Sequence, residues 1–348
     1  MLNGKNILVT GGTGSFGQAF CRYVLTHFKP NRLIVFSRDE FKQSLMQEEP
    51  VFRNPCMRYF LGDIRDVQRL TKAMAGVDYV VHAAALKQVP AAEYNPNEFI
   101  KTNIQGSVNV CEAALVNNVE CVVALSTDKA VTPVNLYGAT KLCAEKTFIA
   151  SNSYSGNGRT RFSVVRYGNV LGSRGSVIPL FLKQRALGEV TITDPKMTRF
   201  FLSLEQGVKF VLQSLFSTQG GEIFIPKLGS CSIVELANII APRCKQKIIG
   251  LRPGEKLHET LIPVEESRSV YDCGKYYVIA PTMPYWSSEK DWEINGTLCE
   301  QGFSYTSENN TQWISKTALL RWLKTFLSEK QREHIIASPC LSKTANVY

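Results

Sequence analysis

Two pairs of neighbouring residues in the middle of the chain could carry out acid–base chemistry. The first pair is Tyr137 with Lys141, four residues later. On a helix these two side chains share one face, so the ammonium of Lys141 would lie beside the phenol and lower its pKa. The second pair is Asp128 with Lys129, which could supply a general acid and, as a neutral amine, a general base. Either pair could also be an ordinary group of surface side chains. The predicted helices and strands around each pair decide between a catalytic and a surface role.

Short apolar runs alternate with longer helical patterns through the first half of the chain. This alternation predicts βαβ units and a parallel sheet that is covered by helices on both faces. Both reactive pairs follow the fifth apolar run, a position that favours a role in a nucleotide-binding sheet. The predicted strands are Ile7–Thr10, Leu33–Phe36, Arg58–Leu61, Tyr79–Ala83, Cys121–Leu125 and Phe162–Val165, and the main predicted helices are Asn103–Val116 and Tyr137–Asn152.

A glycine-rich turn follows the first predicted strand and opens the first predicted helix. Glycine permits a tight turn and a close approach of the backbone to a pyrophosphate, and the helix N-terminus supplies free N–H donors. The placement therefore predicts a dinucleotide site. Its expected contacts in this turn are Gly11, Thr13, Gly14, Ser15, Phe16 and Gly17.

The end of the second predicted strand indicates which dinucleotide is bound. An NAD enzyme usually carries an acidic residue there, whereas this chain has Ser37-Arg38-Asp39 with Lys42 nearby. Because Ser37, Arg38 and Lys42 could hold a 2′-phosphate, the sequence predicts NADP. Asp63 is placed either to bind the adenine amine or to cap a helix. The remaining expected cofactor contacts are Asp39, Ile64, Ala83, Ala85, Tyr137 and Lys141.

The regular alternation ends near residue 168, and shorter elements follow. We therefore expect an α/β fold: a Rossmann-type doubly wound parallel sheet with a smaller C-terminal substrate-binding lobe. The expected domains are 1–168 for NADP binding, with a segment near 200–226 returning to it, and 169–330 mainly for the lobe. Residues 331–348 are expected to form a disordered tail. Within the lobe the pattern predicts helices at Ser232–Ile240 and Ala318–Leu327 and a strand at Lys247–Leu251.

Several longer motifs make the sequence similar to the extended short-chain dehydrogenase/reductases that act on nucleotide sugars. These motifs are Gly11–Gly17, His82–Ala85, Tyr137–Lys141 and Arg166–Val170. The likeness narrows to the inverting UDP-N-acetylglucosamine 4,6-dehydratases, of the type that starts pseudaminic acid synthesis, through Ser37–Glu40, Ala85–Lys87, Ser126–Lys129, Met197–Phe200 and Arg252–Glu259. It runs from about residue 5 to about residue 325.

The resemblance implies oxidation at C4 of the sugar, loss of water across C5 and C6, hydride return to C6 and inversion at C5. Tyr137 would then be the base at the C4 hydroxyl, Thr127 would hydrogen-bond the C4 oxygen, and Asp128 would be the acid at C6. Retaining relatives have Asp-Glu where this chain has Asp-Lys, so Lys129 must remove the C5 proton, with a pKa lowered by burial and neighbouring cations. The substrate contacts that the resemblance implies are Lys87, Asn169, Arg199, Arg252 and Glu255, while Asn103 could be only a fold-stabilising residue.

Other functions compete with this interpretation. A nucleotide-sugar 4-epimerase would share the glycine-rich turn, Tyr137 and Lys141, but it has no use for Asp128 and Lys129. A non-catalytic NADP-binding sensor would be expected to lack the Tyr/Lys pair. The formal charge of +10 suggests a nucleic-acid binder, but the 40 Lys and Arg residues are dispersed, so we expect no nucleic-acid partner.

The rest of the composition predicts the setting of the protein. Its ten cysteines form no C-x-x-C pair, so we expect reduced thiols and no bound metal. The chain has no apolar run near the roughly 18 residues of a membrane span and no signal-peptide pattern at its N-terminus, which predicts a cytoplasmic protein. The expected partner is UDP-N-acetylglucosamine, and the resemblance implies a homo-oligomer, a hexamer being known for the type.

Overall fold

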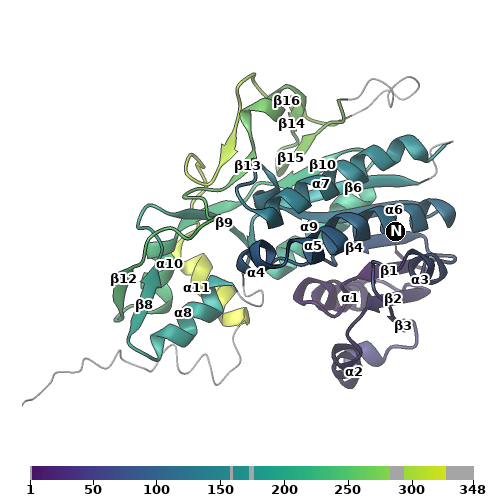
Figure 1. The fold of residues 1–348 in the computed structure, drawn as a ribbon, viewed down its shortest axis with the longest axis horizontal. Coiled ribbons are helices and arrows are strands. Elements are labelled where there is room, and N and C mark those ends of the chain that lie inside the picture. Colours follow the sequence, from purple (N-terminus) through teal and green to yellow (C-terminus); the bar gives the residue numbers. More distant parts are fainter. Residues whose placement is uncertain (1, 157–159, 172–175, 283–293, 327–348) are drawn as a thin grey trace, which may run out of the picture. The chain divides into compact units, whose positions relative to one another are not determined.

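The computed structural model describes residues 2–156, 160–171, 176–282 and 294–326 (Figure 1). These residues divide into two compact units, each built from separate stretches of chain. Unit 1 contains the described residues up to Tyr167, then Glu205–Lys227 and Thr260–Ser304. Unit 2 contains Gly168–Leu204, Leu228–Glu259 and the described residues from Tyr305 onward. The tail expected at 331–348 lies outside the described residues.

Unit 1 is built on a sheet in which ten strands are described. Its parallel part has the order β3-β2-β1-β4-β5-β6-β10, and β15, β14 and β16 continue it in antiparallel pairing. The strands are β1 (Asn6–Thr10), β2 (Arg32–Ser37), β3 (Met57–Leu61), β4 (Tyr79–His82), β5 (Cys121–Thr127), β6 (Arg161–Tyr167), β10 (Ile223–Pro226), β14 (Val270–Asp272), β15 (Tyr276–Ile279) and β16 (Thr297–Leu298); a short strand, β13 (Thr260–Ile262), follows unit 2's second stretch. This strand order confirms the predicted doubly wound fold, whose ligand crevice lies where the order reverses beside β1 and β4.

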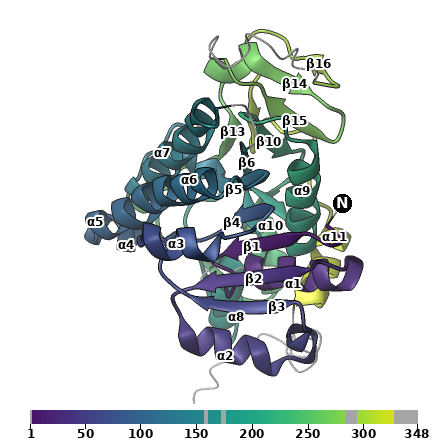
Figure 2. The same cartoon turned by 90° about the vertical axis from the view of Figure 1, so that its right-hand side faces the viewer.

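Helices cover both faces of this sheet. Figure 2 shows α3, α6 and α7 on one face and α1 and α9 on the other. The helices of unit 1 are α1 (Ser15–His27), α2 (Glu40–Glu48), α3 (Val67–Ala73), α4 (Val89–Tyr94), α5 (Pro96–Phe99), α6 (Gly106–Val116), α7 (Leu136–Ala150) and α9 (Leu204–Ser217). With helices on both faces, the strands must be apolar on both sides, and β5 is indeed buried along its whole length.

One predicted helix begins differently from the expectation. Residues Ile100–Gln105 form a π-helix, and α6 begins only at Gly106 rather than at Asn103. Within this π-helix the buried Asn103 side chain bonds both backbone groups of Leu86. A Cβ on Gly106 would lie 2.6 Å from Cδ1 of Ile64, so the chain needs glycine where α6 starts.

Unit 2 has its own small sheets and its own core. Strand β9 (Thr198–Leu202) pairs with β11 (Gly229–Ser232) and β7 (Asn169–Val170), and β8 (Glu189–Ile192) pairs with β12 (Lys245–Ile248). The helices are α8 (Val177–Arg185), α10 (Ile233–Ile240) and α11 (Lys316–Phe326). The apolar faces of these helices meet strand β9 in one cluster that includes Phe181, Leu236 and Leu319 from the helices and Phe201 from β9. The two predicted helices of this region are thereby confirmed over the described residues, while Leu327, the expected end of the second, lies outside them.

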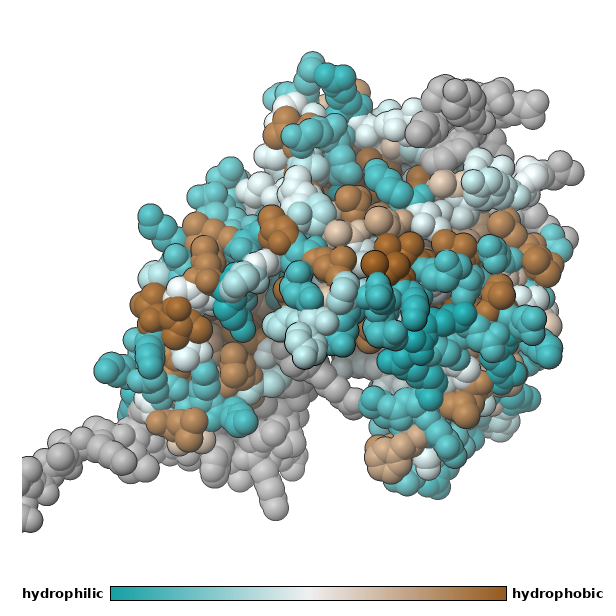
Figure 3. All heavy atoms as spheres, viewed as in Figure 1, coloured by the Kyte–Doolittle hydropathy of each residue, from teal (hydrophilic) through white to brown (hydrophobic). Residues whose placement is uncertain are grey.

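The strand predicted at Lys247–Leu251 was placed too late in the chain. Strand β12 covers Lys245–Ile248, and the chain then turns through Gly250, which has a φ of +82°. The apolar residues that suggested a strand, Ile248, Ile249 and Leu251, are about half exposed. Figure 3 shows apolar side chains gathered on the surface of unit 2 near β8 and β12. In the ranges described, no helix has the length and apolar character of a membrane span.

Candidate active site

The glycine-rich turn joins β1 to α1 in unit 1. Gly11 N donates to Phe36 O at 2.9 Å, and Gly14 N donates to Gly11 O at 2.9 Å, so the turn folds back on its own backbone. Helix α1 begins at Ser15, and Gly14 brings no side chain to cap its first N–H groups. These donors and the helix dipole are therefore available to an anion.

Two positions of the turn accept only glycine, because a Cβ atom there would clash with neighbouring backbone atoms. Gly11 has a φ of +67°, and a Cβ there would lie 2.9 Å from the backbone of Ala84. A Cβ on Gly17 would lie 2.5 Å from Cα of Gly12, so α1 packs directly on the turn. The predicted contacts Thr13 and Phe16 flank this backbone. The residues present thus fit a bound pyrophosphate, as the spacing predicted.

The predicted 2′-phosphate residues lie together after β2. The Ser37 hydroxyl is 2.9 Å from the Thr13 hydroxyl, which ties this strand end to the glycine-rich turn. Arg38 Nη1 lies 3.6 Å from Asp63 Oδ2, and the Arg38 side chain is 54% exposed. Asp39 caps α2 through the backbone N of Lys42 and pairs with Lys42 Nζ at 2.6 Å, so Lys42 lowers the pKa of Asp39.

The predicted contacts after β3 and β4 line the same end of the sheet. Asp63 accepts three hydrogen bonds from Arg65, and these fix its carboxylate in the turn after β3. In this position its Oδ2 lies beside Arg38. Ile64 is buried. Ala83 and Ala85 belong to the loop that follows His82, and Ala83 N donates to Thr10 O at 3.2 Å. The carboxyl ends of β1, β2, β3 and β4 therefore all contribute predicted cofactor residues.

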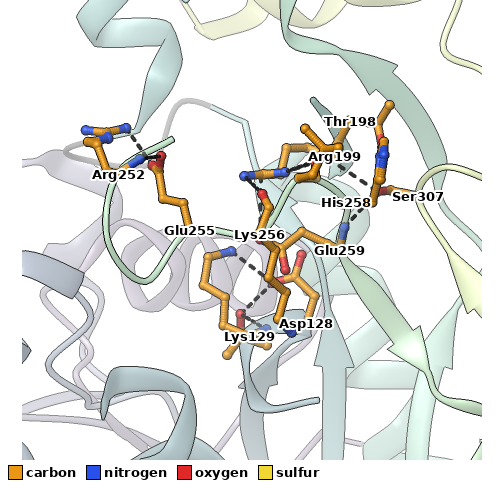
Figure 4. Close-up of polar contacts among 12 residues, drawn as sticks. Asp128, Lys129, Thr198, Arg199, Arg252, Glu255, Lys256, His258, Glu259 and Ser307 are labelled. Atoms are coloured by element: carbon orange, nitrogen blue, oxygen red, sulfur yellow. Dashed lines mark hydrogen bonds and ion pairs between the residues drawn. The ribbon is translucent and has the colours of Figure 1, made fainter. Parts of the chain in front are cut away.

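Thr127, Asp128 and Lys129 form a compact polar group where β5 ends. Lys129 Nζ lies 2.9 Å from Asp128 Oδ1 (Figure 4). Thr127 Oγ1 donates to the same oxygen at 2.9 Å. Asp128 is fully buried, while the Lys129 side chain is 26% exposed. Asp128 Oδ2 is buried without a hydrogen-bond partner among the described residues. The Asp128 carboxylate therefore has one oxygen that accepts from Thr127 and Lys129 and one oxygen that could engage a ligand.

Helix α7 brings Tyr137 to this group, and Gly138 makes the approach possible. Asn135 caps the helix by accepting from Gly138 N at 2.8 Å. A Cβ on Gly138 would lie 2.1 Å from Lys129 O, so only glycine lets α7 begin directly against the Asp128–Lys129 turn. The buried Tyr137 ring packs against Phe99 and Ala92. Steric fit at Gly138 thus fixes where the phenol lies.

The pKa of Tyr137 differs from the sequence prediction. Burial raises the pKa of Tyr137 to about 12, whereas the spacing with Lys141 predicted a lowered value. The groups that oppose burial are the charge of Lys129 and a hydrogen bond with Thr127. The expectation that Lys141 lowers the phenol pKa is therefore wrong for this structure, because desolvation is larger and Lys129 supplies the opposing charge.

Lys141, one turn after Tyr137 on α7, is buried and reaches strand β5. Its Nζ donates to Leu125 O at 2.7 Å. Burial lowers the pKa of Lys141 to about 8, and Glu145, one turn further along α7, acts in the opposite direction. Burial and the nearby Lys141 charge lower the pKa of His82 to about 3, so this histidine is neutral.

A buried ion-pair network holds α7 in place, and the sequence analysis gave it no role. Arg166 of β6 binds Glu145 through Nε at 3.1 Å and Nη2 at 2.7 Å. The same guanidinium binds Glu266 at 2.7 Å and Leu261 O at 2.9 Å. A glutamate inside an apolar helix pattern, and an arginine inside an apolar strand pattern, are the sequence signal that could have revealed the pair.

Asn103 makes the contacts of a fold-stabilising residue next to the site. Its side chain binds Leu86 N, Leu86 O and the Thr140 hydroxyl, at 2.8, 2.9 and 3.0 Å. It therefore joins the loop that carries Lys87 to the helix that carries Tyr137. Partial burial and the charge of Lys129 lower the pKa of Lys87. Lys87 thus belongs to the same electrostatic group as Asp128 and Lys129.

The other predicted substrate contacts lie in unit 2. Arg252 Nη2 is 2.7 Å from Glu255 Oε1, and the Arg252 side chain is 59% exposed. Arg199, by contrast, is buried and directed at backbone oxygens. Asn169 Oδ1 is buried with no hydrogen-bond partner among the described residues. Two of these residues, Arg252 and Asn169, therefore have groups that a ligand could engage. Within the described ranges, no three His, Cys, Asp or Glu side chains are arranged to hold a metal ion.

Comparison with known proteins identifies relatives over most of the chain. Residues 7–281 match the family described as polysaccharide biosynthesis protein. A Campylobacter jejuni protein (subsp. jejuni serotype O:23/36, strain 81-176) named UDP-N-acetylglucosamine 4,6-dehydratase (inverting) is 54% identical over 327 residues, 92% of this chain and 97% of that protein. A Rickettsia bellii protein (strain RML369-C) named UDP-glucose 4-epimerase is 45% identical over 287 residues, 79% of this chain and 82% of that protein.

Solved structures share the fold. The X-ray structure of Pen from Bacillus thuringiensis has a TM-score of 0.85 and 38% identity, covering 94% of this chain and 100% of that chain. The dTDP-glucose 4,6-dehydratase DesIV from Streptomyces venezuelae, with NAD and TYD bound, has a TM-score of 0.65 and 24% identity, covering 72% of this chain and 86% of its own. The second likeness shows the fold alone.

Proposed function

This chain belongs to the polysaccharide biosynthesis protein family, within the extended short-chain dehydrogenase/reductases, and we infer that it is an inverting UDP-N-acetylglucosamine 4,6-dehydratase. The reaction gives UDP-2-acetamido-2,6-dideoxy-β-L-arabino-hex-4-ulose. The observation that carries this function is the ion pair of Lys129 with the buried Asp128, 2.9 Å apart and directly after Thr127. A dehydratase needs an acid and a base at neighbouring carbons, and this pair supplies both.

The pair can reach both required protonation states by moving one proton. Transfer of a proton from Lys129 Nζ to Asp128 leaves a neutral amine and a neutral carboxylic acid, with no change in total charge. The amine then takes the C5 proton, and the acid protonates the departing C6 hydroxyl, which leaves as water. The 2.9 Å separation of Lys129 Nζ and Asp128 Oδ1 places the two groups within direct proton-transfer distance.

The other steps fall to Tyr137, Thr127 and the dinucleotide. Tyr137 takes the proton of the C4 hydroxyl, and Thr127 hydrogen-bonds the C4 oxygen. A nicotinamide dinucleotide, held by the glycine-rich turn, Tyr137 and Lys141, would supply the hydride chemistry that oxidation at C4 and reduction at C6 require. Inversion follows when Lys129 returns a proton to C5 from the opposite face.

The proposed function is tested by the product formed from UDP-N-acetylglucosamine. The protein is incubated with this sugar nucleotide, and the product is followed by NMR. A 6-methyl, 4-keto sugar with inverted C5 is the expected result. UDP-N-acetylgalactosamine as the product would instead support a 4-epimerase, the second candidate, which the 45% identity to proteins named UDP-glucose 4-epimerase favours. No turnover would support a sensor.

We propose NADP as the dinucleotide, and Arg38 as the residue that selects it. The wild-type protein, denatured after purification, is expected to release NADP, which chromatography identifies. Arg38→Ala removes the half-exposed guanidinium beside Asp63 and should shift the bound cofactor towards NAD, because a 2′-phosphate loses its charged partner. Arg58→Ala, at an exposed arginine of β3, is the matched control and should release NADP as the wild type does. NAD alone in the wild type would contradict the assignment.

The proposal extends to the setting of the enzyme. We propose a homo-oligomer, a hexamer being known for the type, in the cytoplasm, with a product that enters the synthesis of pseudaminic acid or a related surface glycan. Light scattering of the purified protein measures the assembly directly.

A further inference from the structure

Helix α7 carries three polar side chains at a regular spacing. Tyr137, Lys141 and Glu145 follow one another at intervals of four residues, so they share one face of the helix, and all three are buried. The first two are assigned to the sugar and the dinucleotide. Glu145, one turn further along, has no part in the proposed chemistry.

Arg166 of β6 fixes the carboxylate of Glu145. It binds Oε1 through Nε at 3.1 Å and Oε2 through Nη2 at 2.7 Å. Nη1 of the same guanidinium donates to Leu261 O at 2.9 Å and to Glu266 Oε2 at 2.7 Å. The side chains of Arg166 and Glu145 are each only 1% exposed. Because both of its oxygens are held, the Glu145 carboxylate cannot turn towards Lys141 or towards solvent.

Lys141 has no directly bound carboxylate among the described residues, and its Nζ donates to Leu125 O at 2.7 Å. Burial lowers the pKa of Lys141 to about 8, and the charge that opposes burial is that of Glu145. Other titratable groups face this stretch of α7 from the neighbouring elements: His82 of β4, which is neutral, Asp128 after β5, Arg166 of β6 and Tyr137 of α7 itself. The two buried cations, Lys141 and Arg166, are thus balanced by the carboxylates of Glu145 and Glu266.

We propose that Glu145 is a positioning residue that acts on Lys141 without touching it: its carboxylate, held by Arg166, keeps the Lys141 ammonium charged and leaves the donors of that ammonium available to the dinucleotide. A carboxylate paired directly with Lys141 would occupy those donors. A buried ammonium with no counter-charge would lose its proton. This inference rests on the proposed function, because Lys141 is assigned there to the dinucleotide.

The titration of Lys141 tests the proposal directly. The protein is isotope-labelled at the lysine Cε atoms, purified with its dinucleotide and followed by NMR, and the Lys141 signal is identified by its loss in Lys141→Met. Glu145→Gln keeps the size of the side chain and leaves Arg166 paired with Glu266, so the fold should be retained. The pKa of Lys141 is then expected to fall by at least about one unit, because the buried ammonium loses its counter-charge.

Release of the dinucleotide in dialysis separates this role from a purely structural one. At about pH 7.5 the release from Glu145→Gln should be roughly threefold faster than from the wild type, since the charged fraction of Lys141 falls by about that factor when its pKa falls from about 8 to about 7. At about pH 5.5 Lys141 is charged in both proteins, so the two rates should be equal. Glu145→Asp preserves the charge and is expected to release the dinucleotide slowly at both pH values. The matched control Glu112→Gln, at an exposed glutamate of α6, should change neither the titration nor the release.

Each remaining outcome decides the proposal. An unchanged pKa of Lys141 in Glu145→Gln overturns it, and equally faster release at both pH values would show that Glu145 only supports the fold, which overturns it as well. If Glu145→Gln does not fold, Glu266→Gln decides in its place: it removes the other carboxylate of the same guanidinium and must lower the pKa of Lys141 in the same direction. A wild type purified without dinucleotide would contradict the proposed cofactor, while the shift of the Lys141 titration would still test the counter-charge.

Discussion

Replacing Lys129 with alanine is expected to lower the rate of dehydration by roughly 10²–10⁴-fold, the effect of a lost general base. The dinucleotide should stay bound, because Lys129 belongs to the Asp128 turn and not to the glycine-rich turn. In D₂O the wild type should place solvent deuterium at C5, whereas the variant should not. Oxidation at C4 does not need Lys129 as a base, so reduced nicotinamide is expected to accumulate and is measured by its absorbance.

Lys146→Ala provides the matched control for this experiment. Lys146 is an exposed lysine on α7, the same helix that carries Tyr137. Its removal should leave the rate, the deuterium exchange and the product unchanged. If Lys129→Ala still forms the inverted product at close to the wild-type rate, the C5 base is another residue. The proton transfer proposed between Lys129 and Asp128 would then also be wrong.

Tyr137→Phe should block the reaction one step earlier. The loss of a base at the C4 hydroxyl is expected to lower the rate by roughly 10²–10⁴-fold, and without C4 oxidation the C5 proton is not acidic. This variant should therefore show neither reduced nicotinamide nor deuterium at C5, in contrast to Lys129→Ala. Phenylalanine preserves the packing of the buried ring against Phe99 and Ala92. NMR in D₂O distinguishes the two variants.

The pKa of Tyr137 adds a pH dependence to this prediction. Because the pKa is about 12, the fraction of phenolate rises with pH throughout the neutral range. The rate of C4 oxidation in the wild type should rise from about pH 6 to about pH 8 and should be flat in Tyr137→Phe. The exposed Tyr154, in the short helix that follows α7, supplies the control Tyr154→Phe, which should keep the wild-type profile. Deuterium at C5 in Tyr137→Phe would contradict the role of the phenol.

The sequence patterns predicted the parts of the fold that depend on local, repeated signals. Strands such as β1 and β5 are apolar runs between helices, and burial on both faces leaves that pattern in the sequence. The glycine-rich turn and the Tyr137–Lys141 pair have fixed spacings, so their local arrangement also follows from sequence. The antiparallel strands β14, β15 and β16 could not be predicted, because they are two to four residues long and carry no clear alternation.

The sequence could not predict how deeply each side chain of the site is buried. The charge of Lys141 suggested a lowered pKa for Tyr137, but full burial of the phenol has the larger effect. In the same way, Arg199 has the residue type of a diphosphate ligand, and only the structure shows that it is buried and donates to three backbone carbonyls. The close approach of Gly138 to Lys129 is likewise a tertiary contact.

The division of each unit into separate stretches of chain has a consequence for synthesis on the ribosome. Strand β6 is buried on both faces, and β10 pairs with it along its outer edge. In the sequence, however, more than fifty residues separate β6 from β10, and most of them belong to unit 2. While those residues are being made, the nascent chain carries a long unpaired sheet edge, which is a known template for aggregation. A fragment that stops near residue 168 would keep that edge permanently, so the nucleotide-binding half is not a separable module.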